Sequence, residues 1–378
     1  MEVDSKNNFL VFDSEKILEQ ICKAPLSFEK VKEGYLMKRM VGVGFRGQKT
    51  QFIFPDKIKI KPSTAGLIVG EGYFKRNFIF CNSNETVIKE IMDFLFQFNF
   101  KLHFVLEIAM KNMPKKFINE SKIKWEELIK NKIKRIRLRN EFNNTSIQGS
   151  LHIALYNSLF PKVLEKILKI IKIKAENEED IAQDYLRGII AAEGNINVKS
   201  TTTNCLYMIR ISAKRKEERE HYKKCLKRIG LNIYCQDMET ISPEEGIKLG
   251  WKTNKGRAGA VIISRWDNFI KIFENDLLIM HQEKVKKFNE HFFYNKFTKQ
   301  FLDFEPFINR EFSMKEVQNH FNFSGRYLNR VFTFLAKEYI SRRKINQRNY
   351  IYKMTDKYKS LYNKLNLIPS SPTSQSPL

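Results

Sequence analysis

Two short apolar segments, residues 64–72 and 186–194, repeat the same order of residue types and constrain the fold more than any other feature. Each has small residues four positions apart and ends with a glutamate that is followed by glycine. The small residues are Gly66 and Gly70 in the first segment and Gly188 and Ala192 in the second. Positions four apart lie on one face of a helix, so two such helices can bring their backbones unusually close. We therefore expect two helices that pack through these residues and that each end at a left-handed glycine.

The pairing of these helices would place Glu71 and Glu193 together, at the C-terminal ends of both. Two carboxylates would then face each other beside unpaired carbonyl groups and the negative ends of two helix dipoles. Without a counter-charge, one carboxylate should keep its proton. A divalent cation removes the conflict, and oxygen ligands favour a hard one such as Mg²⁺. Metal ions held by paired carboxylates are what phosphodiester hydrolysis needs. The alternative is an ordinary buried helix with a solvated glutamate in each segment, and the repetition argues against it.

The paired segments resemble the LAGLIDADG motifs of a family of homing endonucleases, and the resemblance covers about residues 55–294. It implies an α+β fold in which two pseudo-symmetric αββαββα halves pack on their motif helices. It also implies that Glu71 and Glu193, the acids before the final glycines, bind catalytic Mg²⁺. Val69 and Ala191 stand where the motif has an earlier acid. Because a carboxylate is kept at both catalytic positions, the resemblance implies an active enzyme.

The family also places a basic or amide residue of its sheet near each scissile phosphate. Arg210, expected in the second strand after Glu193, and Lys252 match this role, although a surface cation on a basic protein is usually just solvated. In the first half, Phe80 stands at the position comparable with Arg210. The next helix is expected about 14 residues after Glu71 but about 22 after Glu193. The first half should therefore lack most of one strand of the sheet that, in this family, lies in the DNA major groove.

The charge of the chain points to nucleic acid as the partner. The sequence has 67 basic and 42 acidic residues and a net charge of +25, which attracts a polyanion. No apolar run approaches the length of a membrane span, so nucleic acid is favoured over a membrane surface. The five cysteines form no CxxC pair and are expected to be reduced thiols. We expect a cytoplasmic, prokaryote-like protein that associates with the nucleoid.

Residues 299–368 resemble a winged helix-turn-helix domain. We expect helices at 313–320 and 326–339 and a basic hairpin at 341–352, and the second helix of such a domain enters the major groove. Arginine pairs bidentately with phosphate oxygens. The residues expected to contact phosphate are Arg326, Arg330, Arg342, Arg343 and Arg348. The alternative is a small helical cap with a solvated basic face.

The full organisation follows from these segments. We expect an N-terminal extension of uncertain fold at 1–54, the first half at 55–174, the second half at 175–298, the winged domain at 299–368 and a disordered tail at 369–378. An acidic linker at 175–180 should precede the second motif helix.

The sequence and the resemblance together predict a free-standing, Mg²⁺-dependent endonuclease. It would cut double-stranded DNA as a monomer with an internal pseudo-two-fold axis. One alternative is a DNA-binding transcriptional regulator that keeps the fold and has lost cleavage. A second is an RNA-splicing maturase, for which RNA would be the partner.

Overall fold

The structure is a computed structural model of the chain. It describes residues 2–4, 8–23, 25–39, 51–109, 117–139, 149–199, 205–237, 259–293, 298, 301–321, 325, 332, 335, 338–345 and 349–367. The chain divides into two compact units. The first comprises 1–195, 209–263 and 275–285, and the second comprises 196–208, 264–274 and 286–378. In the described ranges, no helix has the length and apolar character needed to cross a membrane.

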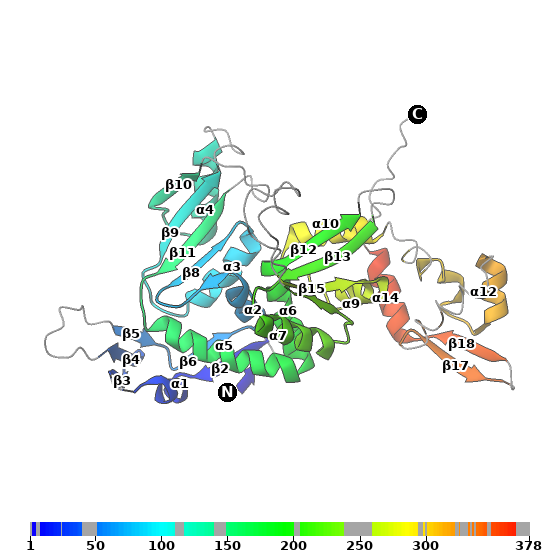
Figure 1. Cartoon of the computed structure of the whole chain (residues 1–378), viewed down its shortest axis with the longest axis horizontal. Helices are drawn as coiled ribbons and strands as arrows, with labels where there is room; N and C mark the ends of the chain where they lie inside the picture. Colours follow the sequence, from blue (N-terminus) through cyan, green and yellow to red (C-terminus); the bar gives the residue numbers. More distant parts are fainter. Residues whose placement is uncertain are drawn as a thin grey trace. The chain divides into compact units, whose positions relative to one another are not determined.

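The two motif segments are helices that pack directly on each other in the first unit (Figure 1). They are α2 (Pro62–Glu71) and α6 (Glu179–Glu193). Pro62 suits the first turn of α2, where its missing N–H costs no hydrogen bond. Glu179 and Asp180 stand in the first turn of α6, where the helix dipole favours negative charge.

The acidic stretch 175–180 is not a linker, and that prediction was wrong. Helix α5 (Phe160–Asn177) extends into it, and only Glu178 separates α5 from α6. Acidic residues are compatible with a helix start, so their accumulation there did not indicate a loop. The two long helices are therefore joined almost without a connection.

The small residues of α2 and α6 are required by the close approach of the two backbones. A Cβ atom on Gly66 would lie 2.2 Å from the carbonyl oxygen of Tyr185, and one on Gly188 would lie 1.9 Å from that of Ser63. The predicted interface is therefore confirmed, because no side chain larger than hydrogen fits at these two crossing points.

The glycines after the two acids do not adopt the left-handed conformation that the sequence suggested. Gly72 has φ −83° and Gly194 has φ −75°, both in extended backbone. A Cβ at Gly72 would instead lie 2.4 Å from the oxygen of Ile68, and one at Gly194 would lie 2.5 Å from that of Ile190. Close approach to the last helical turn explains glycine at both positions.

The first half carries a five-stranded sheet of order β10-β9-β11-β8-β7. Its strands are β7 (Gly72–Tyr73), β8 (Phe78–Asn82), β9 (His103–Ala109), β10 (Arg135–Arg139) and β11 (Ser150–Leu155). Strand β7 has only two residues, which confirms that the first half lacks most of one strand. Strand β10 is parallel to β9 and follows α4 (Phe117–Ile129), whereas the other pairs are antiparallel. Helix α3 (Glu85–Leu95) begins at Asn84, whose side chain accepts from the Val87 amide.

The second half carries a four-stranded sheet of order β12-β13-β15-β14. Its strands are β12 (Gly194–Lys199), β13 (Cys205–Ser212), β14 (Tyr234–Gln236) and β15 (Ala260–Ser264). Its helices are α7 (Lys216–Arg228), α9 (Trp266–Glu274) and α10 (Gln282–Phe292). The predicted α+β architecture, with two halves that meet on their motif helices, is confirmed.

The N-terminal residues form two three-stranded sheets. Their elements are β1 (Glu2–Asp4), β2 (Phe9–Asp13), α1 (Ser14–Ile21), β3 (Leu26–Val31), β4 (Gly34–Arg39), β5 (Gln51–Phe54) and β6 (Lys57–Ile60). Asp13 caps α1 by accepting from the Lys16 amide. Strand β2 pairs with β6, the strand that leads into α2, so this region is continuous with the first half.

The C-terminal residues form a three-stranded sheet of order β16-β18-β17 with flanking helices. The elements are β16 (Phe312–Ser313), α12 (Met314–Phe321), β17 (Ile340–Lys344), β18 (Tyr350–Met354) and α14 (Asp356–Asn366). The predicted hairpin is present, and most of the predicted helix 326–339 lies outside the described residues. Lys364 donates to the carbonyls of Phe273 and Glu274 at 3.0 and 3.1 Å, so this region packs on α9 within the second unit.

Candidate metal site at the paired motif helices

Glu71 and Glu193 are the last residues of α2 and α6, and the structure brings them together. A Cβ atom on Gly70 would lie 2.5 Å from the Cβ of Ala192 and 3.3 Å from the Cγ of Glu193. The two helices therefore remain in contact up to their final turns. The arrangement that the sequence predicted for the two carboxylates is the one observed.

The pKa values of both glutamates are raised. Burial, and then the charge of Glu193, raise the pKa of Glu71 to about 7, while the ammonium of Lys284 opposes the shift. Burial also raises the pKa of Glu193, again opposed by Lys284. Glu71 is exposed as a residue, so solvent screens part of this effect. Both carboxylates are thus destabilised in their charged form, as expected for acids at two adjoining helix C-termini.

Lys284 on α10 is a positive charge that acts on both glutamates, and sequence reasoning missed it. Its Nζ atom donates to the carbonyl oxygens of Ile190 and Ala191, at 2.9 and 2.5 Å, in the last turn of α6. Burial lowers the pKa of Lys284 to about 8, and the charges of Glu71 and Glu193 oppose the shift. The ammonium therefore satisfies helix carbonyls and partly neutralises the two acids at once.

The segment that carries Lys284 is held along α6 by further hydrogen bonds. The carbonyl of Asn275 accepts from the side chains of Gln183 and Arg187, both at 3.0 Å. Arg187 also pairs with Asp184 at 3.3 Å, and Asp184 accepts from the Ser63 amide at the start of α2. These contacts hold residues 275–284 against α6. Asn275 binds the helix at Gln183 and Arg187, and Lys284 binds it at the last turn.

Asn82 lies next to Glu71, and Asn84 lies next to His281, whose ring feels the charge of Lys284. The Asn82 side-chain amide, at the end of β8, donates to Glu71 over 3.5 Å. Asn84 contacts the His281 ring at 3.4 Å. Burial, and then the Lys284 charge, lower the pKa of His281 to about 4, so the imidazole is neutral at pH 7. Asn82 has the amide chemistry expected of a sheet residue at the site, two residues after Phe80.

Of the other predicted site residues, Arg210, Arg342 and Arg343 lie among the described residues. Arg210 lies half-buried on β13, and the charges of Lys284 and Lys214 both act on Glu193. Lys252, Arg326, Arg330 and Arg348 lie outside the described residues. Arg342 and Arg343 are exposed on β17. Arg343 pairs with Glu311 at 3.4 Å, and the Arg342 guanidinium lies 5.2 Å from the ring centre of Tyr350.

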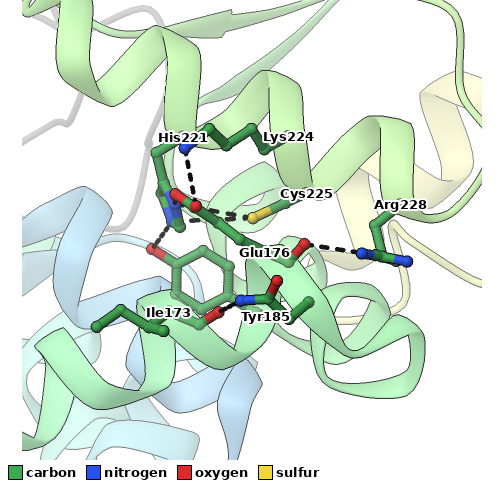
Figure 2. A network of polar contacts seen from close by, with 8 residues as sticks. Ile173, Glu176, Tyr185, His221, Lys224, Cys225 and Arg228 are labelled. Carbon is green, nitrogen blue, oxygen red and sulfur yellow. Dashed lines mark hydrogen bonds and ion pairs between the residues drawn. The ribbon is translucent and has the colours of Figure 1, made fainter.

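A polar network joins α6 to α5 and α7 (Figure 2). The His221 ring on α7 contacts the Glu176 carboxylate of α5 at 2.9 Å and the Tyr185 hydroxyl of α6 at 3.3 Å. Lys224 pairs with the other oxygen of Glu176 at 2.9 Å. Burial lowers the pKa of His221, although Glu176 opposes this. The network is structural, because it orients the helix whose last residue is Glu193.

The second half of the chain is similar to a known family of domains. Residues 180–292 match the model of the LAGLIDADG-like domain. The match covers less than half of the chain. It begins in the first turn of α6 and ends with α10, so it contains both Glu193 and Lys284.

The similarity of this chain to solved structures is weak. Mesophilic variants of the homing endonuclease I-DmoI align with a TM-score of 0.33 and 13% identity, over 58% of this chain and 95% of theirs. I-DmoI in complex with DNA and Mn aligns at 0.32 and 14%, over 57% and 94%. The N-terminal LAGLIDADG domain of DUF199/WhiA aligns at 0.31 and 10%, over 57% and 80%. No curated protein sequence matches significantly. The similarity of this chain to LAGLIDADG proteins therefore rests on the match of residues 180–292 to the family model.

The donor set at the paired helices suits a hard divalent cation. It comprises two carboxylates whose charged forms are destabilised, and the carbonyls of a helix end. Within the described ranges, no cluster of three or more His, Cys, Asp or Glu side chains could hold a metal ion. Glu71 and Glu193 can therefore supply two protein ligands to an ion that completes its shell with other oxygen donors.

The raised pKa of Glu71 predicts a pH-dependent stability in the absence of metal. The folded state binds the proton more tightly than the unfolded chain, so the stabilisation is fully present below pH 4.5 and is lost as the pH rises through about 7. Glu71→Gln should remove this loss, and its stability relative to the parent should rise from pH 5 to pH 7.5. Urea unfolding of both proteins in EDTA measures it, and parallel curves would contradict the assignment.

Proposed function

We propose that this protein is a site-specific endonuclease that hydrolyses phosphodiester bonds of double-stranded DNA, with Mg²⁺ held by Glu71 and Glu193. The observation that carries the proposal is the pairing of these carboxylates at the ends of two helices that touch along their length. The net charge of +25 supports a polyanionic substrate. The LAGLIDADG-like domain at 180–292 supports the endonuclease class.

Each side chain at the site has a role in this proposal. When bound, the metal would activate water and stabilise the leaving 3′ oxygen. Glu71 and Glu193 would hold it, one from each half, so that the two halves address the two DNA strands. Asn82 orients the Glu71 carboxylate through the 3.5 Å hydrogen bond. Lys284 offsets the repulsion between the acids before a metal arrives.

A second candidate function is a DNA-binding regulator without cleavage, and Lys284 is the observation that favours it. Its ammonium binds the last turn of α6 and its charge acts on both acids, so the pair can persist without a metal. Incubation with a randomised plasmid library, with and without Mg²⁺, separates the two functions. Double-strand cuts that require Mg²⁺ support the endonuclease, and retention of DNA without cuts supports the regulator.

The exposed arginines of β17 are proposed to contact DNA phosphates, as in the wing of a winged helix. Replacing both Arg342 and Arg343 by Gln should flatten the slope of log K against log salt by about 0.9 for each lost contact, or about 1.8 together. Affinity should fall most at low salt. Lys32→Gln, in the exposed β3–β4 turn, is the matched loss of charge outside the proposed wing. Fluorescence titrations at several salt concentrations measure the slope, and an unchanged slope would show that the hairpin does not contact DNA.

A further inference from the structure

A protein cation already binds the end of α6, the helix whose last residue is Glu193. The α6 helix ends at Glu193, so the carbonyl oxygens of its last turn lack the amide donors that continue a helix. The exception is the oxygen of Ile190, which accepts a hydrogen bond from the Gly194 N–H. The Lys284 ammonium donates to the oxygen of Ala191 and to that of Ile190. It therefore binds backbone oxygen atoms of the helical turn that ends at Glu193.

The position of this ammonium is fixed by the fold. Residues 275–284 are hydrogen-bonded along α6 at one end by Gln183 and Arg187 and at the other by Lys284 itself. Lys284 is half-buried, and its charge acts on both glutamates. A lysine on a free surface would instead be fully hydrated and would exchange among many rotamers.

We propose that Lys284 is the resident counter-cation of the Glu71–Glu193 pair and sets how tightly the pair binds a divalent metal. The inference rests on the proposed metal role of the two glutamates and concerns a residue that the motif does not contain. Lys284 is a positioning residue in this role, because it acts on the carboxylates and not on the DNA.

The direction of the effect follows from the charges. With Lys284 in place, an incoming divalent cation meets a positive charge and helix carbonyls that are already hydrogen-bonded. Without the ammonium, the two carboxylates and the negative end of α6 lose this counter-charge, and a metal gains more of their attraction. Lys284 thus weakens metal binding while it stabilises the metal-free protein.

The test measures Mn²⁺ binding to the full-length protein without DNA, by calorimetry or by the electron paramagnetic resonance of free Mn²⁺. Lys284→Met, which keeps the side-chain length and removes the charge, should bind at least tenfold more tightly than the parent. Lys284→Arg should bind like the parent. Lys287→Met is the matched control, since Lys287 is exposed on the same helix. Combining Lys284→Met with Glu71→Gln and Glu193→Gln should abolish the gain.

The outcomes distinguish this inference from the proposed function. If Lys284→Met binds like the parent while the glutamate variants lose Mn²⁺, the role of Lys284 is wrong and the metal site stands. If no variant shows Mn²⁺ binding that depends on the glutamates, the metal function fails and the inference fails with it. Urea unfolding checks that each variant is folded. Should Lys284→Met not fold, Lys284→Gln, which keeps a hydrogen-bond donor and loses the charge, must show the same tighter binding.

Discussion

Glu71→Gln and Glu193→Gln should each reduce double-strand cleavage by roughly a thousandfold or more, because a bound metal contributes several kcal/mol to the stabilisation of the transition state. Each glutamine keeps the shape of the side chain and removes a charged ligand. DNA affinity should change little, since phosphate contacts by lysine and arginine provide most of it. Cleavage of a target plasmid and DNA binding, measured on the same samples, give the two readouts.

Glu165→Gln is the matched control for this experiment. Glu165 is an exposed residue of α5, so the substitution makes the same change of charge and shape away from the paired helix ends. Cleavage at the parent rate by both motif variants would rule out the endonuclease. A loss of folding in both would assign the acids a structural role, and urea unfolding separates this from a loss of chemistry.

The central helices could be predicted because their signal is local. Gly66 and Gly188 lie in short apolar runs. Both must be glycine because a Cβ atom at either position would lie about 2 Å from the backbone of the neighbouring helix. This requirement arises whenever a second helix of the same kind packs closely on the first. The position of Glu71 and Glu193 follows from that packing. The shortened strand β7 was visible as a difference in spacing after the two acids.

Lys284 could not be found in this way, because its role depends on a contact with residues more than 90 positions away in the chain. In the sequence it is one of three lysines in the run Lys284–Lys287, and nothing local separates it from Lys286 and Lys287. Only the fold shows that Lys284 is half-buried and that the other two are exposed. The choice of Arg210 and Lys252 followed the family resemblance.

The acidic stretch before α6 was misread for a related reason. Glutamates at 176, 178 and 179 suggested a solvated connection, but Glu176 contacts His221 and Lys224, and Glu179 belongs to the first turn of α6. Charge runs indicate exposure only when no partner lies nearby in the fold. Here the partners come from α7, which follows more than 35 residues later.

Gly188→Ala should lower the free energy of unfolding by about 3 kcal/mol or more, the upper range for overpacking. The added Cβ would lie 1.9 Å from the Ser63 oxygen and 2.7 Å from the Leu67 nitrogen, and both are backbone atoms that cannot rotate away. The helices must therefore separate along their whole contact, which also moves Glu193 relative to Glu71. Urea unfolding in EDTA measures the loss, and Mn²⁺ binding should weaken in parallel.

Gly325→Ala is the control, because a Cβ there meets nothing within 4 Å. Alanine is favoured over glycine in a helix by up to about 1 kcal/mol, so an unhindered substitution should be neutral or slightly stabilising. Alanine is also favoured by helix propensity at Gly188, so the clash must cost more than this gain before the free energy of unfolding falls. If Gly188→Ala unfolds at the same urea concentration as the parent, α2 and α6 do not approach each other as closely as the structure shows. The two glutamates would then be too far apart to share a metal ion.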